Sequence, residues 1–330
     1  MVRAPGSAPG KAGGTACVSQ SPAAPGAAHL KNCKCSVQVP LRFREGPCAG
    51  RPRRHDGASR WNGERQVSDL LLVGCGRMGS ALVKGWLAGN AADRIWAVEP
   101  AELGLADARL HHVRDAAGLP AELAPEVVVL AVKPQMMPEA LPAYRRIARP
   151  GTLFLSIAAG RTLAYLEQGL GEEAAVVRAM PNTPAAIGQG ISVLVANAAV
   201  TPAQRKRAEA LMQAAGQTAW IEDDALMNAV TGVSGSGPAY VFYLIETLAE
   251  AGRAAGLPAD LAMQLARQTV VGAGALAGAA TETPAELRIA VTSPKGTTQA
   301  ALDVLMAPDG LQPLMTRAVA AATQRGRELA

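Results

Sequence analysis

Three glycines between an apolar run and a helical pattern are the first residues of this chain whose spacing indicates chemistry. Leu70–Val73 leads into the sequence GCGRMG at 74–79, after which apolar residues recur at helical steps. In a strand–turn–helix of this kind, Gly74 permits a tight turn, Gly76 lets a pyrophosphate approach the backbone, and Gly79 lets helix and strand pack closely. The helix N-terminus adds free N–H groups and a positive dipole end. The pattern predicts a dinucleotide-binding turn, with an ordinary strand–helix turn as the alternative.

An acidic residue lies where a dinucleotide-binding fold needs one. Ile95–Val98 is predicted as the second strand, and Glu99 follows it directly. A carboxylate at this position can accept hydrogen bonds from the adenosine ribose hydroxyls and would repel a 2′-phosphate. Glu99 is therefore a candidate cofactor ligand that admits NADH as the hydride donor. The alternative is a solvated glutamate at a strand end.

Further apolar runs predict an open sheet with a ligand cleft along one edge. Val127–Val132 is continuously apolar and rich in β-branched residues, which suits a parallel strand buried on both faces. Lys133, Ser156 and Asn182 lie near predicted strand ends, and ligands in such sheets bind outside the carboxyl ends of the strands. Each is a candidate for the cleft, with a structural role in a turn as the alternative. The other predicted elements are strands at 152–157, 175–178, 190–195 and 218–221, and a helix at 202–214 capped by Thr201.

The chain changes character after residue 226. No strand pattern follows, and Ala, Leu, Gln and Glu dominate. After a glycine-rich break at 230–238, helices are predicted at 237–255, 258–278, 283–290, 295–306 and 309–328. Because its Ala/Gly-rich helices suit close packing against other helices, we infer that this half pairs with a second subunit. The predicted organisation is a leader at 1–66, a dinucleotide-binding domain at 67–226 and a helical domain at 227–330.

A second candidate site precedes one of these helices. The sequence VTSPKGTT at 291–298 places hydroxyl residues on both sides of Pro-Lys-Gly at a helix N-terminus. Free backbone N–H groups there can bind a carboxylate. The hydroxyls of Ser293 or Thr298 could hold a polar substrate atom. The alternative is an ordinary Ser/Thr cap.

The scarcity of some residue types limits the kinds of reaction that the chain could catalyse. The histidines are His29, His55, His111 and His112, and the last two are interpreted as exposed turn residues near a third strand. No His–Asp acid/base pair is evident, no cluster suggests catalytic zinc, and Lys295 is the only lysine after Lys206. The reaction should therefore need little acid/base help. Hydride delivery from a nicotinamide cofactor to an electrophilic C=N bond fits this requirement.

Charge and composition exclude several classes of protein. The chain of 330 residues has a net charge of +5, but residues 1–66 hold 11 Lys/Arg against 3 Asp/Glu and the remainder holds 21 against 24. The remainder has no basic stripe, so no nucleic-acid partner is expected. The leader is predicted to be disordered, and Val67 would be a natural start of the protein. No apolar run reaches membrane-spanning length, and the cysteines suit a reducing compartment, so a cytoplasmic enzyme is expected.

Five segments together closely resemble the pyrroline-5-carboxylate reductase family. They are VGCGRMG at 73–79, AVKPQ at 131–135, RAMPNTPAAIGQG at 178–190, VTGVSGSGPAYVF at 230–242 and LRIAVTSPKGTTQAAL at 287–302. The last segment is the most family-specific. The resemblance implies an α/β Rossmann domain followed by an all-α dimerisation domain interleaved with its partner. It also implies reduction of 1-pyrroline-5-carboxylate to L-proline, the last step of proline biosynthesis, with NADPH or NADH.

The resemblance also assigns roles to residues of this sequence. The substrate carboxylate would be held by Ser293 and by the backbone of Gly296 and Thr297, while Thr298 would hydrogen-bond the ring nitrogen and guide its proton. The full set of candidate cofactor-binding residues combines these roles with the glycine turn and the acid after the second strand: Gly74, Gly76, Arg77, Met78, Gly79, Glu99, Ala131, Val132, Lys133 and Pro134. No metal is implied. A homodimer is expected, which could stack into a ring of dimers.

Three positions depart from the usual family pattern. Lys295 stands where glycine is common, and it could add charge beside the carboxylate or point to solvent. Thr283 replaces a frequent histidine, and Ile289 replaces a frequent acid. Two other functions remain open on the same scaffold. A β-hydroxyacid or opine-type dehydrogenase would need a catalytic Lys or His in the helical half, and a nucleotide-sensing protein would bind cofactor without turnover.

Overall fold

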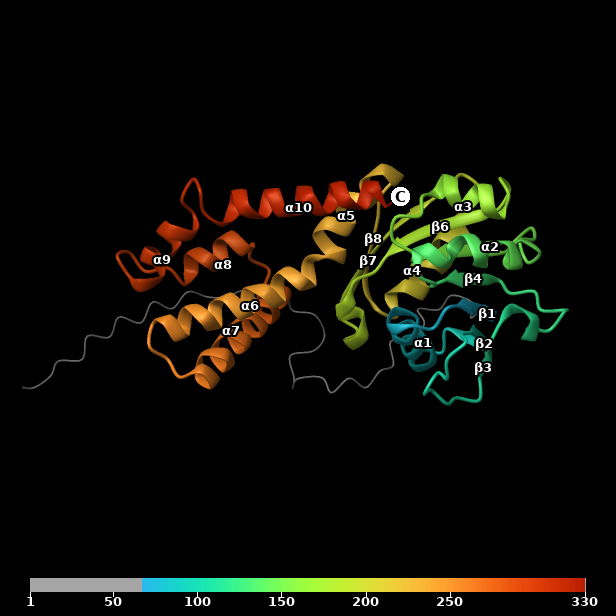
Figure 1. Cartoon of the computed structure of the whole chain (residues 1–330), viewed down its shortest axis with the longest axis horizontal. Helices are drawn as coiled ribbons and strands as arrows, with labels where there is room; N and C mark the ends of the chain where they lie inside the picture. The colour runs from blue at the N-terminus through green and yellow to red at the C-terminus, as the bar shows by residue number, and fades with distance from the viewer. Residues whose placement is uncertain (1–66, 330) are drawn as a thin grey trace, which may run out of the picture. The chain divides into compact units, whose positions relative to one another are not determined.

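The computed structural model describes residues 67–329. The predictions of a disordered leader at 1–66 and of a start at Val67 fall on, or depend on, residues outside this range. The first half of the described chain is one eight-stranded sheet with helices on both faces (Figure 1). The strands are β1 (Val67–Val73), β2 (Ala92–Val98), β3 (Leu110–Val113), β4 (Val127–Leu130), β5 (Leu153–Ser156), β6 (Ala175–Met180), β7 (Gly190–Ala196) and β8 (Gly216–Trp220).

The strand order is β3-β2-β1-β4-β5-β6-β7-β8, and every neighbouring pair is parallel except β6 and β7. The order reverses direction at β1, which lies between β2 and β4. Val73 at the end of β1 pairs with both Val98 and Leu130. This reversal is the position where doubly wound sheets bind dinucleotides, and the strand ends that were predicted as cofactor-binding meet there.

Alternate residues of the apolar strands belong to two different cores, one on each face of the sheet. Leu70 and Leu72 of β1 are fully buried on the face covered by α1 (Arg77–Gly89) and α4 (Pro202–Gln213). Leu71 and Val73 are buried on the face covered by α2 (Met137–Arg145) and α3 (Leu163–Leu170). Burial on both faces explains why these strands are continuous apolar runs rather than alternating patterns.

Local signals define the ends of several helices. Thr201 caps α4 as predicted: its hydroxyl accepts a bond from the Gln204 N–H at 3.3 Å, and the Gln204 side chain accepts from the Thr201 N–H at 2.9 Å. This reciprocal pair is a capping box. Short 3-10 turns follow other strand ends, namely η1 (Ala116–Gly118), η2 (Pro134–Met136) and η3 (Thr183–Ile187).

The second half of the described chain is helical, as predicted, but the glycine-rich break at 230–238 is not a break. Thr231–Gly235 forms a π-helix (η5) that continues directly from α5, and a bend at Ser236 separates it from the next helix, which has Pro238 in its first turn as predicted. Gly232 is buried, and a Cβ there would lie 2.8 Å from the Thr323 hydroxyl, so this glycine permits close packing against the last helix. The helices are η4 (Asp224–Leu226), α5 (Met227–Val230), α6 (Gly237–Ala254), α7 (Ala259–Ala279), α8 (Pro284–Ala290), α9 (Thr297–Leu305) and α10 (Leu311–Glu328).

The helices α6 to α10 expose large apolar side chains. Tyr243 is 65% exposed and Val304 is 71% exposed, whereas the buried residues of α6 and α7 are Ala249, Ala262 and Ala266. Apolar surface of this extent is typical of an interface that another chain covers. Among the helices of residues 67–329, none combines the length and apolarity that a membrane span requires.

The interpretation of His111 and His112 as exposed turn residues is wrong. Both belong to β3, where the His111 ring stacks on Trp96 with 4.6 Å between ring centroids. His112 Nε2 lies 2.7 Å from the Glu99 carbonyl oxygen. The two histidines therefore help to hold the edge strand β3 in place. This role was not predicted because β3 is short and has few apolar residues, so its sequence gives a weak strand signal.

Candidate functional site

The three glycines of the predicted dinucleotide turn have three different local surroundings. Gly74 adopts φ +88°, and a Cβ there would lie 2.9 Å from the backbone of Ala131. A Cβ on Gly79 would lie 2.7 Å from the Gly74 carbonyl oxygen, which reflects the close approach of helix and strand. Gly76 instead faces open space, with no atom within 4 Å of its Cβ position. The turn thus brings β1, the start of α1 and the end of β4 together and leaves room at Gly76.

The N-terminus of α1 suits a phosphate. Gly76 is its N-cap residue, and among the described residues no side chain caps the helix. The first N–H groups, beginning at Arg77, therefore have no side-chain acceptor within this part of the chain. No acidic residue occurs in the first turn. An uncapped helix end carries a positive partial charge, and the missing Cβ of Gly76 lets an anion reach the backbone. These features fit a dinucleotide pyrophosphate.

Glu99 is fixed beside this turn rather than solvated at a free strand end. One carboxylate oxygen accepts a bond from the Cys75 N–H at 2.8 Å, and the other accepts from the Ala101 N–H at 3.3 Å. The carboxylate therefore helps to shape the glycine turn. Its contact with a ribose stays a prediction.

Cys75 lies inside the turn but is not suited to nucleophilic chemistry. It is buried, and desolvation raises the pKa of its thiol, an effect that the Ser80 hydroxyl opposes and the Glu99 carboxylate reinforces. The Ser80 hydroxyl also donates to the Cys75 carbonyl at 2.9 Å. A thiol held neutral by its surroundings is a weak nucleophile. Cys75 therefore packs the turn.

The segment after β4 lies against the turn. The Ala131 N–H donates to the Val73 carbonyl at 2.8 Å, and the Val132 backbone flanks the Gly74 Cα. Lys133 is the N-cap of η2, and the Pro134 carbonyl accepts a bond from Arg161 Nε at 3.0 Å. The structure therefore brings the predicted cofactor residues of 131–134 to the edge that also carries Gly74.

Two other candidates for the cleft have structural partners. Ser156 is buried, and its hydroxyl accepts from the Ala158 N–H at 3.3 Å, which closes the turn after β5. The Asn182 side chain accepts from the Ile191 N–H at 3.0 Å and donates to the Ser234 hydroxyl at 3.4 Å. Ser156 therefore has the structural role named as its alternative. Asn182 joins the end of β6 to the π-helix.

The loop before α9 has the features of a carboxylate site. Gly296 is the N-cap of α9, none of the side chains that the structure describes caps the helix, and its first turn has no acidic residue. The Ser293 hydroxyl lies directly against Gly296, where a Cβ would overlap it. Within residues 67–329, the hydroxyls of Ser293 and Thr298 make no hydrogen bond. Uncapped N–H groups and available hydroxyls therefore occur together at this helix end.

Lys295 adopts φ +60° in this loop. A left-handed backbone is strained for a residue with a Cβ, so this lysine occupies a position that glycine would adopt without strain. The side chain is exposed and has no ion-pair partner among the described residues. Its ammonium is therefore available to a ligand of the loop.

The described chain holds the two groups of candidate residues on separate elements. Hydrogen bonds and close backbone contacts join Glu99, the glycine turn and residues 131–134 into one site. No hydrogen bond or ion pair among residues 67–329 joins the loop at 293–298 to that site.

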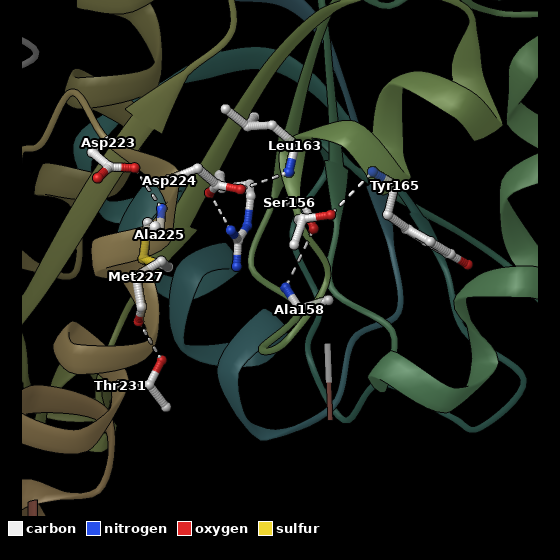
Figure 2. A network of polar contacts seen from close by, with 11 residues as sticks. Ser156, Ala158, Leu163, Tyr165, Asp223, Asp224, Ala225, Met227 and Thr231 are labelled. Carbon is white, nitrogen blue, oxygen red and sulfur yellow. Dashed lines mark hydrogen bonds and ion pairs between the residues drawn. The ribbon is translucent and has the colours of Figure 1, made fainter. Parts of the chain in front are cut away.

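One polar cluster was missed by the sequence analysis. Asp224 lies at the centre of this cluster, and Figure 2 shows its carboxylate beside the backbone of Leu163. One carboxylate oxygen is bonded to Arg178, and the other accepts from the Leu163 N–H at 3.0 Å. Arg178 is 5% exposed, and burial lowers the pKa of its guanidinium, although Asp224 opposes that shift. The sequence feature that could have indicated this cluster is the single arginine in the otherwise apolar strand AVVRAM at 175–180.

Comparison with known proteins decides the family. Residues 224–329 match the domain described as pyrroline-5-carboxylate reductase dimerisation, and residues 70–160 match the coenzyme F420-dependent NADP oxidoreductase domain. A pyrroline-5-carboxylate reductase of Pseudomonas aeruginosa is 42% identical over 264 residues, which cover 79% of this chain and 96% of the relative. The chain belongs to the pyrroline-5-carboxylate reductase family. It is therefore an oxidoreductase that uses NAD(P)H.

Solved structures of the family agree. A pyrroline-5-carboxylate reductase from Coxiella burnetii has a TM-score of 0.73 at 33% identity and covers 80% of this chain and 98% of its own. The Plasmodium falciparum pyrroline carboxylate reductase, solved with NADP bound, has a TM-score of 0.68 at 28% identity and covers 81% and 99%. The predicted fold class, a Rossmann domain followed by a helical dimerisation domain, is confirmed. The match to the dimerisation domain indicates that this protein forms a homo-oligomer. Membership of the family also indicates that its substrate is a small molecule.

Proposed function

We propose that this chain reduces 1-pyrroline-5-carboxylate to L-proline with NADPH or NADH, the last step of proline biosynthesis. The observation that carries the proposal is the loop at 293–298, because it offers uncapped N–H groups and available hydroxyls in a chain that also has a dinucleotide turn. The experiment incubates purified protein with 1-pyrroline-5-carboxylate and either cofactor and measures proline. Cofactor oxidation without proline would contradict the proposal.

The cofactor would lie across the glycine turn. Gly74, Gly79 and the strand end at 131–134 shape the turn, while the N-terminus of α1 at Gly76, Arg77 and Met78 would hold the pyrophosphate. The open space at Gly76 and the uncapped helix end support this assignment. The Glu99 carboxylate would accept hydrogen bonds from the ribose hydroxyls while it still accepts the hydrogen bond from the Cys75 N–H.

The substrate would be held through its carboxylate at the N-terminus of α9. Ser293 would donate its hydroxyl, and the backbone N–H of Thr297 would donate alongside it. The Gly296 N–H, which donates to the Ser293 carbonyl at 3.0 Å in this structure, would turn to the substrate carboxylate when the substrate binds. Thr298 would hydrogen-bond the ring nitrogen one residue further along. The burial of Thr298 is intermediate, whereas Thr297 is exposed, which supports giving the side-chain role to Thr298.

The reduced nicotinamide supplies a hydride, which would add to C5 of the ring C=N bond. The protein's part is to hold the ring in a fixed orientation, exclude water and keep a proton at the nitrogen. A protonated imine accepts hydride readily, so one hydroxyl at Thr298 is sufficient help, and no strong general acid is needed. This division of roles agrees with the absence of a placed histidine in the described helical half.

The same proposal includes the organisation of the protein. We divide it into 67–226, which binds the cofactor, and 227–330, which dimerises and binds substrate, because the last strand ends at Trp220 and only helices follow in the described chain. The apolar surface of α6 to α10 supports a homodimer. A ring of such dimers and a cytoplasmic location are finer proposals, which mass measurement in solution and cell fractionation would test.

We predict that replacing Glu99 with alanine weakens any preference for NADH over NADPH. Removing a carboxylate that bonds ribose hydroxyls and repels a 2′-phosphate should change the ratio of the two kcat/KM values about tenfold, about 1.4 kcal/mol. The measurement is kcat/KM with each cofactor. Glu99→Gln keeps an acceptor for the Cys75 N–H, and Glu102→Gln serves as a control at an exposed acid. An unchanged ratio would leave Glu99 only its role in shaping the turn.

Replacing Lys295 with glycine is expected to stabilise the protein. Glycine adopts φ +60° without strain, so the free energy of unfolding should rise by about 0.5–1 kcal/mol in chemical denaturation. If the ammonium attracts the substrate carboxylate, KM should rise about threefold in the same variant. Lys295→Gln separates the two effects, because it keeps the strained backbone and removes the charge. Equal stability of the glycine variant and wild type would contradict the strain argument.

A further inference from the structure

Arg178 is a charged residue in the interior of an apolar strand. It lies in β6 opposite Ser156 of β5, and its neighbours Val177 and Ala179 are buried. Its side chain is 6% exposed. A buried charge without a partner is costly, so this guanidinium requires a carboxylate that is held in one place.

Asp224 is that carboxylate, and it ties three elements together (Figure 2). One oxygen pairs with Arg178 Nη1 on β6, and the other accepts from the N–H of Leu163, the first residue of α3, at 3.0 Å. Asp224 itself begins η4. The position of η4 is therefore fixed by a charge buried in the sheet and by the N-terminus of a helix.

The segment that follows η4 contacts the end of the same strand. Thr231–Gly235 continues from α5, and the Asn182 amide donates to the Ser234 hydroxyl at 3.4 Å. A Cβ on Gly235 would lie 2.5 Å from Met180 Cε, so this turn of the π-helix packs directly on Met180. The segment from η4 to the π-helix is thus attached to β6 at two places, Arg178 and Met180–Asn182.

This attachment lies at the reactive edge of the sheet. Met180 is the last residue of β6, and the carboxyl ends of the strands are where an open α/β sheet binds its ligand. The π-helix also lies near the start of the helical half, which carries the candidate substrate loop. The ion pair therefore connects the cofactor-binding sheet with the start of the substrate-binding helices.

We propose that Arg178 and Asp224 form a positioning pair, which fixes the segment 224–237 against the carboxyl end of β6 and so aligns substrate with cofactor for hydride transfer. The inference rests on the proposed function. In this proposal neither residue touches the substrate or the cofactor. Hydride transfer depends steeply on the distance and angle of the reacting atoms, so a small shift of this segment should slow the chemical step more than it weakens binding.

The test is Asp224→Asn in the full-length protein, because asparagine keeps the shape and an acceptor but loses the charge. We expect kcat to fall about 30-fold, with KM for 1-pyrroline-5-carboxylate and the dissociation constant of the cofactor changed less than about threefold. The deuterium isotope effect on kcat with 4-deuterated cofactor should rise, because a misaligned chemical step becomes rate-limiting. A merely structural ion pair would change the amount of folded protein but not this isotope effect.

Glu126→Gln is the matched control. Glu126 pairs with Arg207 at 3.1 Å, accepts from the Ser68 N–H at 2.8 Å and is 24% exposed, like Asp224, but it lies before β4, away from the carboxyl edge. It should lose stability without losing kcat.

A second variant keeps the inference testable if Asp224→Asn folds poorly. Arg178→Met combined with Asp224→Leu removes both charges and leaves none unpaired. A wild-type kcat and isotope effect in either folded variant would overturn the positioning role of the pair and leave the proposed function standing. If the wild-type protein makes no proline, the proposed function fails and the inference fails with it.

Discussion

Replacing Thr298 with alanine is expected to lower kcat about 30-fold, while KM for 1-pyrroline-5-carboxylate changes less than about threefold. The hydroxyl makes no hydrogen bond within the described residues and lies at the uncapped start of α9. Its proposed partner is the ring nitrogen, where charge changes as the hydride arrives. Loss of a bond that matters most in the transition state lowers turnover rather than substrate affinity.

The conservative variant and a distant control complete this test. Thr298→Ser keeps the hydroxyl and should retain most of kcat. Thr316→Ala removes an exposed threonine hydroxyl that bonds within α10, to the Gln312 carbonyl at 3.0 Å, and should leave kcat unchanged. Steady-state kinetics on all three proteins measure the effect. Wild-type kinetics in Thr298→Ala would remove Thr298 from the mechanism.

Replacing Gly76 with alanine should abolish tight cofactor binding without destabilising the fold. No atom lies within 4 Å of the Cβ position, and φ is −66°, so the free protein accommodates alanine. A bound pyrophosphate would occupy that open space, so the methyl group should raise the cofactor dissociation constant about 100-fold, about 2.7 kcal/mol. Cofactor titration and thermal unfolding of the same sample measure both quantities.

Gly79→Ala provides the contrast within the same turn. Its Cβ would lie 2.7 Å from the Gly74 carbonyl oxygen, so this variant should lose stability as well as cofactor binding. The pair separates a glycine required by the ligand from one required by the fold. Normal cofactor affinity in Gly76→Ala would exclude the proposed pyrophosphate position.

The sequence predicted most of the sheet because its strands are buried on both faces. Runs such as Val127–Val132 have no polar residue to interrupt them, and such continuity is typical of a central parallel strand. The turn at 74–79 was equally predictable from the sequence. Gly74 and Gly79 each meet a local steric requirement, and Gly76 leaves open space for a ligand. The cap at Thr201 followed from its own side-chain chemistry.

The features that the sequence did not reveal depend on partners distant along the chain. The antiparallel pairing of β6 and β7 places residues such as Val177 and Ala196 together, and nothing in either strand specifies direction. The pair between Arg178 and Asp224 spans 46 positions. The glycine-rich segment at 230–238 was predicted as a break because glycine disfavours helices, yet Gly232 and Gly235 are needed for close packing in a π-helix.

The candidate substrate site was predicted mainly by resemblance. Taken alone, Ser293 and Thr298 near a helix N-terminus indicate an ordinary cap. In the described part of the chain α9 has no side-chain cap, which is the physical reason to prefer a ligand there. The strained Lys295 could not be anticipated in detail, because backbone conformation at a single loop residue follows from the whole turn.

The proposed reaction is direct hydride transfer from the nicotinamide to C5 of the substrate ring. The measurement that tests it uses NADPH or NADH deuterated at C4, prepared separately with the label on each face, and analyses the proline by mass spectrometry and NMR. We expect proline with one deuterium at C5 from one labelled face and unlabelled proline from the other. Proline without deuterium from either face, or cofactor oxidation without proline, would contradict it.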